Sequence, residues 1–565
     1  MSGHQSQTGP GTFSQIDHAR QDRSASPREG SHPASDGFDL AQAALVEMHA
    51  AGFRPEFAAG VAGQLETIRS GLAAQQPGNG HEILIEDLRG LVWSSIDNDT
   101  SRDLDQIEVA ERVPGGIHVS VAIADVASAV ARDTPIDEHA RAQTQTVYTA
   151  VKQFPMLPFE LSTGLTSLNE SADRLAILMS FTISPDGAMS HERVSRAWVR
   201  NRAQLAYSRV GPWLDRQAGT ADQPTSSPVE IAGLRSDSAR DAEQASGEKF
   251  SEADGAMLTA HLAEQLRLQD EAAHALRKAR VENGALEFHR AEAEPVLVDG
   301  RLISVHAVLQ NRAMYLIEDL MVAANGVMAR TLRSGGRSGL QRVVRVPRRW
   351  DRIVALAAEH GAVLPATPDS QALNLFLAEQ RRSDPVHYPD VAVAVIKLMG
   401  SGEYTVIRPD EDPTGHFGLA ARDYTHSTAP NRRYPDLVTQ RILHAMLDDR
   451  PAPYSDEELA AIATHCNEAD KALRKIERNM QKRVAAVAMA HRTGEAFRGV
   501  VTGASPKGVY VRVIDPPFEG RVVQGEQGLD VGDRVVVKLL HTDPQRAFID
   551  FARVPSGTAG HDGPG

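Results

Sequence analysis

The chain has 565 residues, more than one hydrophobic core ordinarily organises, so several domains are expected. Its formal net charge is −14, from 74 acidic and 60 basic residues, which argues against a general polyanion binder but not against a local basic channel. The single cysteine, Cys466, excludes an internal disulfide framework, and no apolar run is long enough to cross a bilayer, so we expect a cytoplasmic protein without membrane contact.

The N-terminal part of the chain has two sections of different composition. Residues 1–37 are rich in Ser, Gly, Gln and Pro and lack the apolar segment of a signal peptide, so they are predicted to be a disordered tail. Residues 38–80 form a predicted helical module, in which apolar residues recur at helical spacing on both sides of Gly52. Two short helices across a tight turn are typical of a helix-turn-helix, and equally of a plain helical hairpin packed on its neighbour.

The stretch from Ser95 to Gln106 places four aspartates within nine residues. Neighbouring carboxylates raise one another's pKa unless a cation or solvent relieves the repulsion. Apolar residues precede the stretch, and the alternating segment 117–126 follows it, so we expect a loop between strands of one sheet. Hard oxygen ligands on a short loop suit Mg²⁺, and a solvated acidic turn is the alternative. The four aspartates are Asp97, Asp99, Asp103 and Asp105.

Strand patterns continue to about residue 200, and helical patterns dominate afterwards. Residues 217–254 are poor in large apolar side chains and are predicted to be a mobile insertion. Ser455 and Glu458 form a capping box that should begin a long helix. The other predicted helices cover residues 256–280, 311–332 and 436–447.

The last unit, residues 496–555, has five short strand patterns separated by glycine-containing turns, which is typical of an OB-type barrel. Tyr510 and Arg512 share one face of a strand, as a stacking surface for single-stranded nucleic acid requires, although an ordinary exposed strand could look the same. Residues 556–565 are predicted to be a disordered tail.

The stretch from Asp97 to Gln106 resembles the acidic signature of the RNase II/RNase R (RNB) family of 3′→5′ exoribonucleases. The resemblance extends over about residues 83–555, and the final barrel resembles an S1-type RNA-binding domain. The other motifs, in the family's order, are Tyr148 with Phe154–Pro158, Gly284–Phe288, Leu316–Asp319 with Ala323–Asn325, Tyr424–His426, and Arg432–Leu437.

The resemblance implies a multidomain α+β fold. It comprises the helical module at 38–80, an RNB catalytic domain at 83–493 and an S1-type barrel at 496–555. It also implies that Asp97, Asp103 and Asp105 hold Mg²⁺, which would activate a water, and that Arg432 stabilises charge on the scissile phosphate.

The resemblance further implies a set of RNA contacts. Tyr148 and Phe288 would stack on the terminal bases, although Phe288 could be a core residue. Glu318 and Asn325 could bond a ribose hydroxyl, or Asn325 could serve helix packing. Arg433 could contact a phosphate or form a salt bridge. The remaining predicted RNA contacts are Tyr510 and Arg512, and Glu468 falls where the family has a glutamate near the site.

Two features depart from the family pattern. The family usually has two adjacent aspartates where this chain has Asp105 and Gln106, so Gln106 would offer Mg²⁺ a neutral carbonyl oxygen, and Mn²⁺ could serve instead. The N-terminal residues also have neither the length nor the strand pattern for the two cold-shock-type barrels that the family often carries there.

We therefore expect a monomeric, Mg²⁺-dependent, processive 3′→5′ exoribonuclease. It would degrade single-stranded RNA with a free 3′ end to nucleoside 5′-monophosphates. A catalytically impaired RNA-binding protein is the main alternative, motivated by Gln106. A phosphohydrolase for small molecules is a more remote one.

Overall fold

The structure is a computed structural model that describes residues 38–74, 85–218, 234–238, 252–288, 291–298, 301–385, 387–505 and 508–555. The predicted tails at 1–37 and 556–565 lie outside these ranges, as does most of the predicted insertion at 217–254. Within these ranges, no helix combines the length and apolar character that crossing a bilayer requires.

A six-stranded sheet carries the acidic stretch. Its strand order is β1-β8-β2-β3-β4-β7, and β8 also pairs with β7. The antiparallel neighbours β2 and β3 flank the aspartates, which confirms that the stretch is a loop between strands of one sheet. The strands are β1 (Glu86–Asp87), β2 (Trp93–Asp97), β3 (Gln106–Val113), β4 (Gly116–Ala124), β7 (Asp173–Ile183) and β8 (Met189–Ala206).

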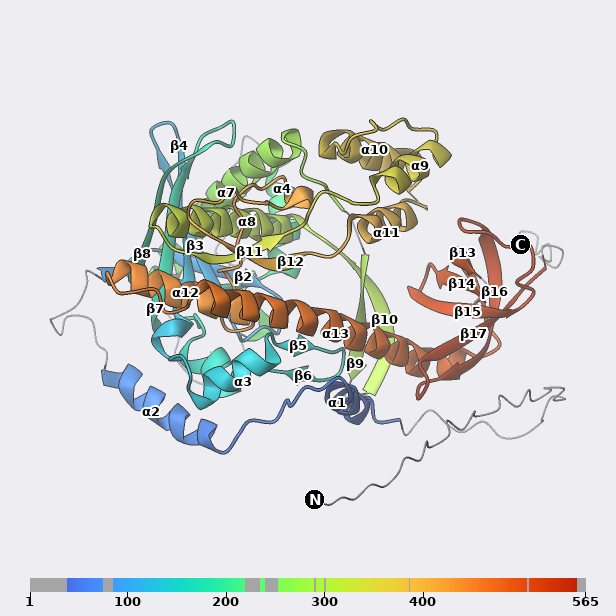
Figure 1. The fold of residues 1–565 in the computed structure, drawn as a ribbon, viewed down its shortest axis with the longest axis horizontal. Helices are drawn as coiled ribbons and strands as arrows, with labels where there is room; N and C mark the ends of the chain where they lie inside the picture. Colours follow the sequence, from blue (N-terminus) through green and yellow to red (C-terminus); the bar gives the residue numbers. More distant parts are fainter. Residues whose placement is uncertain are drawn as a thin grey trace, which may run out of the picture. The chain divides into compact units, whose positions relative to one another are not determined.

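Long helices pack on this sheet around one large apolar core. The helices α7 and α8 lie side by side, and α7 also contacts β3 (Figure 1). The core includes Ile107 of β3, Leu266 of α7 and Leu320 of α8. The main helices of this part are α3 (Pro135–Gln143), α4 (Tyr207–Ala218), α7 (Glu252–Glu282), α8 (Arg312–Ser334) and α12 (Tyr434–Leu447).

The predicted N-terminal helices are present as α1 (Leu40–Ala50) and α2 (Gly60–Ala74), but they pack in different places. α1 buries Met48 in a cluster with residues of the long helix α13 (Asp456–Met489). α2 buries Val61 in the large core. Because each helix packs on a different neighbour, the two helices brace the rest of the fold and do not form a separate helix-turn-helix unit.

Smaller elements complete the part of the fold that precedes the barrel. Three helices form a lobe with its own apolar cluster, which also includes Leu286. These helices are α9 (Trp350–Glu359), α10 (Ser370–Ser383) and α11 (Tyr388–Met399). The two-stranded pairs are β5 (Val147–Tyr148) with β6 (Gln153–Phe154), β9 (Ala291–Val298) with β10 (Arg301–Leu309), and β11 (Gly339–Val343) with β12 (Glu403–Ile407).

The helix α13 leads into the C-terminal barrel. It begins with the predicted capping box, in which Ser455 and Glu458 each bond the other's backbone N–H. The barrel is closed in the order β13-β14-β15-β17-β16, which confirms the predicted five-stranded unit (Figure 1). A Cβ at Gly520 would lie 2.5 Å from the Phe551 ring, so a larger residue there would disturb the packed interior. The strands are β13 (Ala496–Ser505), β14 (Gly508–Val513), β15 (Phe518–Gln524), β16 (Arg534–Asp543) and β17 (Phe548–Arg553).

Candidate active site

Ser167 holds the acidic loop in place through hydrogen bonds to the loop backbone. The Ser167 hydroxyl accepts a hydrogen bond from the Leu104 N–H at 2.9 Å and donates one to the Arg102 carbonyl at 2.7 Å. The Leu104 carbonyl in turn accepts from the Leu168 N–H at 3.0 Å. The fully buried Leu104 side chain anchors the loop in the core, so Asp103 and Asp105 are held on either side of this anchor.

Asp105 joins the acidic loop to a second loop more than 300 residues later. Its Oδ1 accepts from the Asn431 N–H at 3.0 Å, and its Oδ2 accepts from Arg432 Nε at 3.1 Å. Burial raises the pKa of Asp105 to about 7, although Arg432 and the Asn431 N–H favour its charged form. The structure thus brings together the two residues to which catalysis was assigned from the sequence.

The second loop owes its shape to Asp436, in the first turn of α12. Asp436 Oδ1 accepts from the Ala429 N–H at 2.8 Å and from Arg433 Nη2 at 2.7 Å. Pro435 favours helix initiation at this point. An N–H group in the first turn of a helix has no acceptor within the helix, so a proline there loses no hydrogen bond. Arg433 is therefore engaged in the salt bridge that was the alternative to a phosphate contact.

Arg432 is arranged differently from Arg433. Its side chain is 48% exposed, and it is bonded only through Nε. Its two Nη groups have no hydrogen-bond partner in the described part of the chain. A guanidinium held at one edge and open at the other can present two parallel N–H groups to a phosphate.

Tyr148 reaches the same site from β5, which follows a segment that begins at Thr144. This segment runs along the Arg432 loop, where the Thr146 N–H donates to the Arg432 carbonyl at 3.0 Å and the Tyr434 N–H donates to the Thr144 carbonyl at 2.8 Å. The Tyr148 hydroxyl donates to Asp103 Oδ2 at 2.7 Å, and the residue is 47% exposed. An exposed ring fixed at its hydroxyl end is suited to stacking on a base.

Asp97 and Asp99 face different partners. Asp97 Oδ1 accepts from the Asn98 N–H and from the Ser101 hydroxyl, each at 2.8 Å. Burial raises the pKa of Asp97, and the charge of Asp103 acts in the same direction. Asp99 forms an ion pair with Arg209 at 3.1 Å. Asp99 is therefore engaged with Arg209 rather than with the partners of Asp97.

Gln106 is almost completely buried at the start of β3. Its Nε2 lies 3.4 Å from the carbonyl oxygen of Ile96, on the neighbouring strand β2. Its amide is thus oriented by the sheet, and its role as a metal ligand stays a prediction.

The donor set of the acidic loop fits a divalent ion that is shared with a substrate. No three His, Cys, Asp or Glu side chains converge on one point among the residues that the structure describes. However, Asp97 Oδ2 and Asp103 Oδ1 have no hydrogen-bond partner in that part of the chain. Mg²⁺ commonly uses only one or two carboxylates and completes its shell with water and substrate phosphate oxygens.

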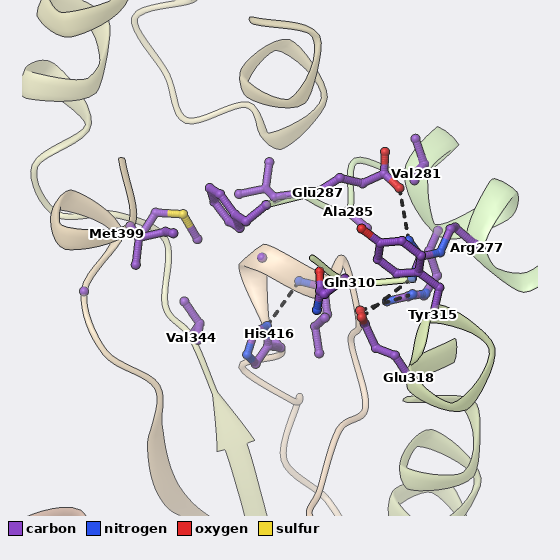
Figure 2. A pocket seen from close by; sticks show the side chains of 17 residues that line it. Arg277, Val281, Ala285, Glu287, Gln310, Tyr315, Glu318, Val344, Met399 and His416 are labelled. Carbon is purple, nitrogen blue, oxygen red and sulfur yellow. Dashed lines mark hydrogen bonds and ion pairs between the residues drawn. The ribbon is translucent and has the colours of Figure 1, made fainter. Parts of the chain in front are cut away.

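A cavity of about 330 Å³ contains two of the predicted RNA contacts, Phe288 and Glu318. Figure 2 shows Glu318, Tyr315 and Arg277 on one wall and Met399 and Val344 on the opposite side. The Arg277 guanidinium lies 4.0 Å from the centre of the Tyr315 ring, which places a cation and an aromatic face at the wall. Phe288 also packs against the apolar cluster of the α9–α11 lobe, so both of its predicted roles have support.

Neighbouring acidic residues at this cavity differ in their partners. Asp319 is buried and bonded by Arg277 Nε at 2.8 Å and by Arg280. Glu318 is 41% exposed, and its nearest cation, Arg277, lies at 3.7 Å. Asp319 thus fixes the arginines, while Glu318 stays accessible from the cavity.

Asn325 is engaged inside the protein. Its Oδ1 accepts from the Ser427 N–H at 2.8 Å and from the Ser427 hydroxyl at 2.9 Å, and it is 2% exposed. Its Nδ2 donates to the Thr428 hydroxyl at 3.3 Å. These bonds favour the packing alternative, since Asn325 ties α8 to the loop that carries Arg432.

The predicted contacts outside the catalytic core differ in accessibility. Arg512 forms a bidentate pair with Asp390 of α11, with distances of 3.1 and 2.9 Å, so the structure uses it to join the barrel to the lobe. Tyr510 is partly exposed on β14. Glu468 is exposed on α13, and no described side chain bonds it.

Two further residues near the acidic loop, the buried Glu108 and the partly buried Tyr207, were not predicted from the sequence. Tyr207 begins α4, and burial together with the charges of Asp97 and Glu108 raises its pKa. Glu108 of β3 is fully buried, and burial and the charge of Asp97 raise its pKa well above the usual range. The sequence held no such signal for Glu108, because polar and apolar residues alternate from Gln106 to Val109 and Glu108 falls on the polar side of that alternation.

Comparisons with known proteins identify the family of the chain. The family model described as RNB domain matches residues 85–449, and the model of the RNase II-type exonuclease C-terminal S1 domain matches residues 495–554. Ribonuclease R of Escherichia coli is 28% identical over 509 residues, which are 84% of this chain and 58% of that protein. Ribonuclease R of Vibrio cholerae is 29% identical, over 77% of this chain and 50% of that protein. The chain thus spans little more than half the length of these relatives.

Solved structures share the fold. The apo form of Mycoplasma genitalium RNase R has a TM-score of 0.74 at 20% identity, covering 91% of this chain and 78% of that one. Yeast Ssd1, described as a pseudonuclease, has a TM-score of 0.57 at 15% identity, covering 83% of this chain and 55% of that one. Since the RNB model covers most of the chain and the S1 model covers the barrel, the chain belongs to the RNase II/RNase R (RNB) family.

Proposed function

We propose that this protein is a divalent-metal-dependent exoribonuclease that degrades RNA processively from a free 3′ end and releases nucleoside 5′-monophosphates. The observation that carries the proposal is the contact between Asp105 and Arg432 in the site of an RNB family member. One group is anionic and buried, while the other is cationic and half exposed. Such a pair suits phosphodiester hydrolysis, where the protein must hold a phosphate and stabilise developing charge.

Each residue of the site has a task in this proposal. Asp105 fixes the guanidinium of Arg432 at Nε, so that the Nη groups can bind the scissile phosphate. Tyr148 stacks on a terminal base while its hydroxyl orients Asp103. Asp97 and Asp103 would hold the metal, with Asp105 close by. A bound Mg²⁺ or Mn²⁺ would activate water and offset phosphate charge.

In this proposal, the cavity binds another part of the same RNA strand. Glu318 is accessible there and could accept a hydrogen bond from a ribose hydroxyl, which DNA lacks. Phe288 lines the same cavity and could stack on a base. A solved structure of the Mycoplasma genitalium relative contains single-stranded RNA, and we propose single-stranded RNA as the substrate of this chain.

A catalytically impaired RNA-binding protein is the second candidate. It is favoured by Gln106 and by the structural likeness to yeast Ssd1, which is described as a pseudonuclease. We favour catalysis because Asp97, Asp103 and Asp105 are all retained together with Arg432, whereas a decayed site would have lost several of these groups.

Product analysis separates the two candidates. Purified protein is incubated with uniformly labelled RNA in Mg²⁺, in Mn²⁺ and in a chelator, and the products are resolved by chromatography. The proposal predicts nucleoside 5′-monophosphates with either metal and no products with chelator or with Asp105→Asn. RNA that is bound but stays intact in both metals would establish the second candidate instead.

A further inference from the structure

Glu108 is a buried carboxylate whose two oxygens both lack a partner. It is 0% exposed, and neither Oε atom has a hydrogen bond within the described part of the chain. Other buried carboxylates near the site, such as Asp105 and Asp436, are bonded by N–H groups. An unpaired buried carboxylate is unfavourable unless a counter-charge or a proton satisfies it.

The surroundings of Glu108 offer it oxygen atoms rather than cations. It stands directly opposite Ser94 across β2 and β3, and the Ser94 hydroxyl is also without a partner in the described residues. Gln269 of α7 donates its Nε2 to the Glu108 carbonyl at 3.3 Å, but its own Oε1 is unpaired there. A group of buried, unsatisfied oxygens is the environment that a hard cation stabilises.

Glu108 also has a defined place relative to the acidic loop. Residues two apart on a strand share a face, so Glu108 and Gln106 lie on the same face of β3. Asp97 is the charged residue whose field acts on Glu108, and Tyr207 lies within the field of both. Glu108 is therefore two positions beyond Gln106 on one face of β3, and the charge of Asp97 acts on its carboxylate.

We propose that Glu108 supplies the negative charge that Gln106 lacks and thereby helps to hold the divalent ion of the acidic loop. This inference rests on the metal dependence of the proposed function. It explains two observations together. Gln106 is neutral where the family usually has an aspartate, and the unpaired carboxylate of Glu108 lies two positions later on the same face of β3. The competing explanation is a protonated core glutamic acid that has no influence on metal binding.

Metal titration of the full chain without RNA tests the inference. Mn²⁺ binding is measured by calorimetry for wild type, Glu108→Gln, and the swap variant that combines Gln106→Asp with Glu108→Gln. Loss of a group that supports a metal site weakens metal affinity by about 10- to 100-fold, and we expect a change of that size for Glu108→Gln. The swap should restore most of the affinity, since it moves one carboxylate by two positions.

The matched control is Glu111→Gln, the same chemical change on the same strand at an exposed position, which should bind Mn²⁺ as wild type does. Thermal unfolding provides a second measurement. Without metal, Glu108→Gln should be at least as stable as wild type, because an unpaired buried carboxyl is removed. The rise in Tm on adding Mn²⁺ should be reduced.

Wild-type affinity in Glu108→Gln, or a swap variant that stays weak, would overturn the inference. The proposed function fails in a different way. RNA cleavage that requires metal, together with an unchanged Glu108→Gln titration, rejects only the inference. Normal metal binding with intact RNA rejects only the proposed function.

Discussion

At the scale of single residues, the central feature is that one carboxylate orients one guanidinium. Asp105 uses one oxygen for the Asn431 N–H and the other for Arg432 Nε. The backbone contact fixes the loop, and the side-chain contact fixes the direction of the cation. Charge on Asp105 should therefore affect both the proposed metal site and the proposed phosphate contact of Arg432.

Replacing Asp105 with Asn keeps the shape but removes this charge. We expect RNA affinity to be retained and single-turnover cleavage to fall by at least about 10²-fold, because the metal and its activated water are held less well. The control is Asp99→Asn in the same loop, whose partner is Arg209. Cleavage by Asp105→Asn at the wild-type rate would remove Asp105 from the mechanism.

Tyr148 combines a stacking surface with a hydrogen bond to Asp103, and two substitutions separate these roles. Tyr148→Ala removes the ring and should weaken RNA binding by about 1–3 kcal/mol. Tyr148→Phe keeps the ring and should bind RNA normally but cleave it more slowly, because Asp103 loses its partner. Fluorescence anisotropy on an Asp105→Asn background measures binding without cleavage. Equal affinities for the two variants would contradict the stacking role.

Asp125 is a buried, charged residue whose ion pairs contribute to the stability of the fold. Its Oδ2 accepts from Arg196 at 3.1 Å, and His444 lies 3.0 Å from its Oδ1. Burial alone would raise the pKa of Asp125, but His444 and Arg196 lower it below the usual value. A lowered pKa in the folded state means that this stabilisation is complete above the unfolded pKa, about 3.9, and is lost as the pH falls through the folded pKa.

Asp125→Asn should therefore destabilise the protein by about 3–5 kcal/mol at pH 7, because it leaves Arg196 without its buried partner. Urea unfolding of wild type and variant gives the difference in free energy at each pH. The difference should persist at pH values above the unfolded pKa and shrink as acid protonates Asp125 in the wild type. A difference that grows in acid would contradict this account.

At the scale of elements, the barrel is joined to the catalytic part by identifiable contacts. Arg512 of β14 pairs with Asp390 of α11 through two hydrogen bonds. Ala486 and Met489, at the end of α13, belong to the apolar cluster of the barrel. The predicted RNA surface on β14 therefore also serves as a joint with the α9–α11 lobe.

Because Asp390 already bonds Nε and Nη2 of Arg512, we expect Arg512→Ala and Asp390→Ala to have similar small effects on RNA affinity. The double variant should lose no more than either single one. Affinities are measured across a salt titration, with Arg498→Ala on β13 as an exposed control. If Arg512→Ala alone reduces the salt slope by about one, Arg512 contacts a phosphate and the original prediction holds.

The elements also show what the sequence could predict. The acidic loop, the capped helix α13 and the barrel could be predicted from local patterns. Residue spacing, helix caps and turns each depend on residues that are close together in the sequence. The internal partners of Asn325, Arg433 and Arg512 could not be predicted in the same way. Asp390 lies 122 positions from Arg512, and only the folded chain shows that this arginine is already paired.

At the scale of the whole molecule, the chain combines an RNB domain and an S1 barrel, and its matches cover 58% and 50% of the Ribonuclease R proteins of Escherichia coli and Vibrio cholerae. The helices α1 and α2 brace the catalytic part from two sides. In the proposed function, the RNB domain carries the hydrolysis site together with some RNA contacts, and the barrel adds further RNA contacts.

Deleting residues 496–565 tests this division. The barrel should contribute phosphate contacts, so its loss should weaken RNA binding and reduce the salt dependence of that binding. The single-turnover rate at saturating RNA should stay close to wild type, since the site lies in the RNB domain. Unchanged affinity over the whole salt range would show that the barrel does not bind RNA.

The direction of cleavage tests the central claim most directly. Two samples of one RNA, labelled at the 5′ or at the 3′ end, are incubated with the protein and Mg²⁺. The 3′ label should appear at once as a mononucleotide, while the 5′ label should end in a short oligonucleotide. A 3′-phosphate should block both reactions, and Asp105→Asn should leave both RNAs intact. Early release of the 5′ label, or internal fragments from both RNAs, would contradict the account.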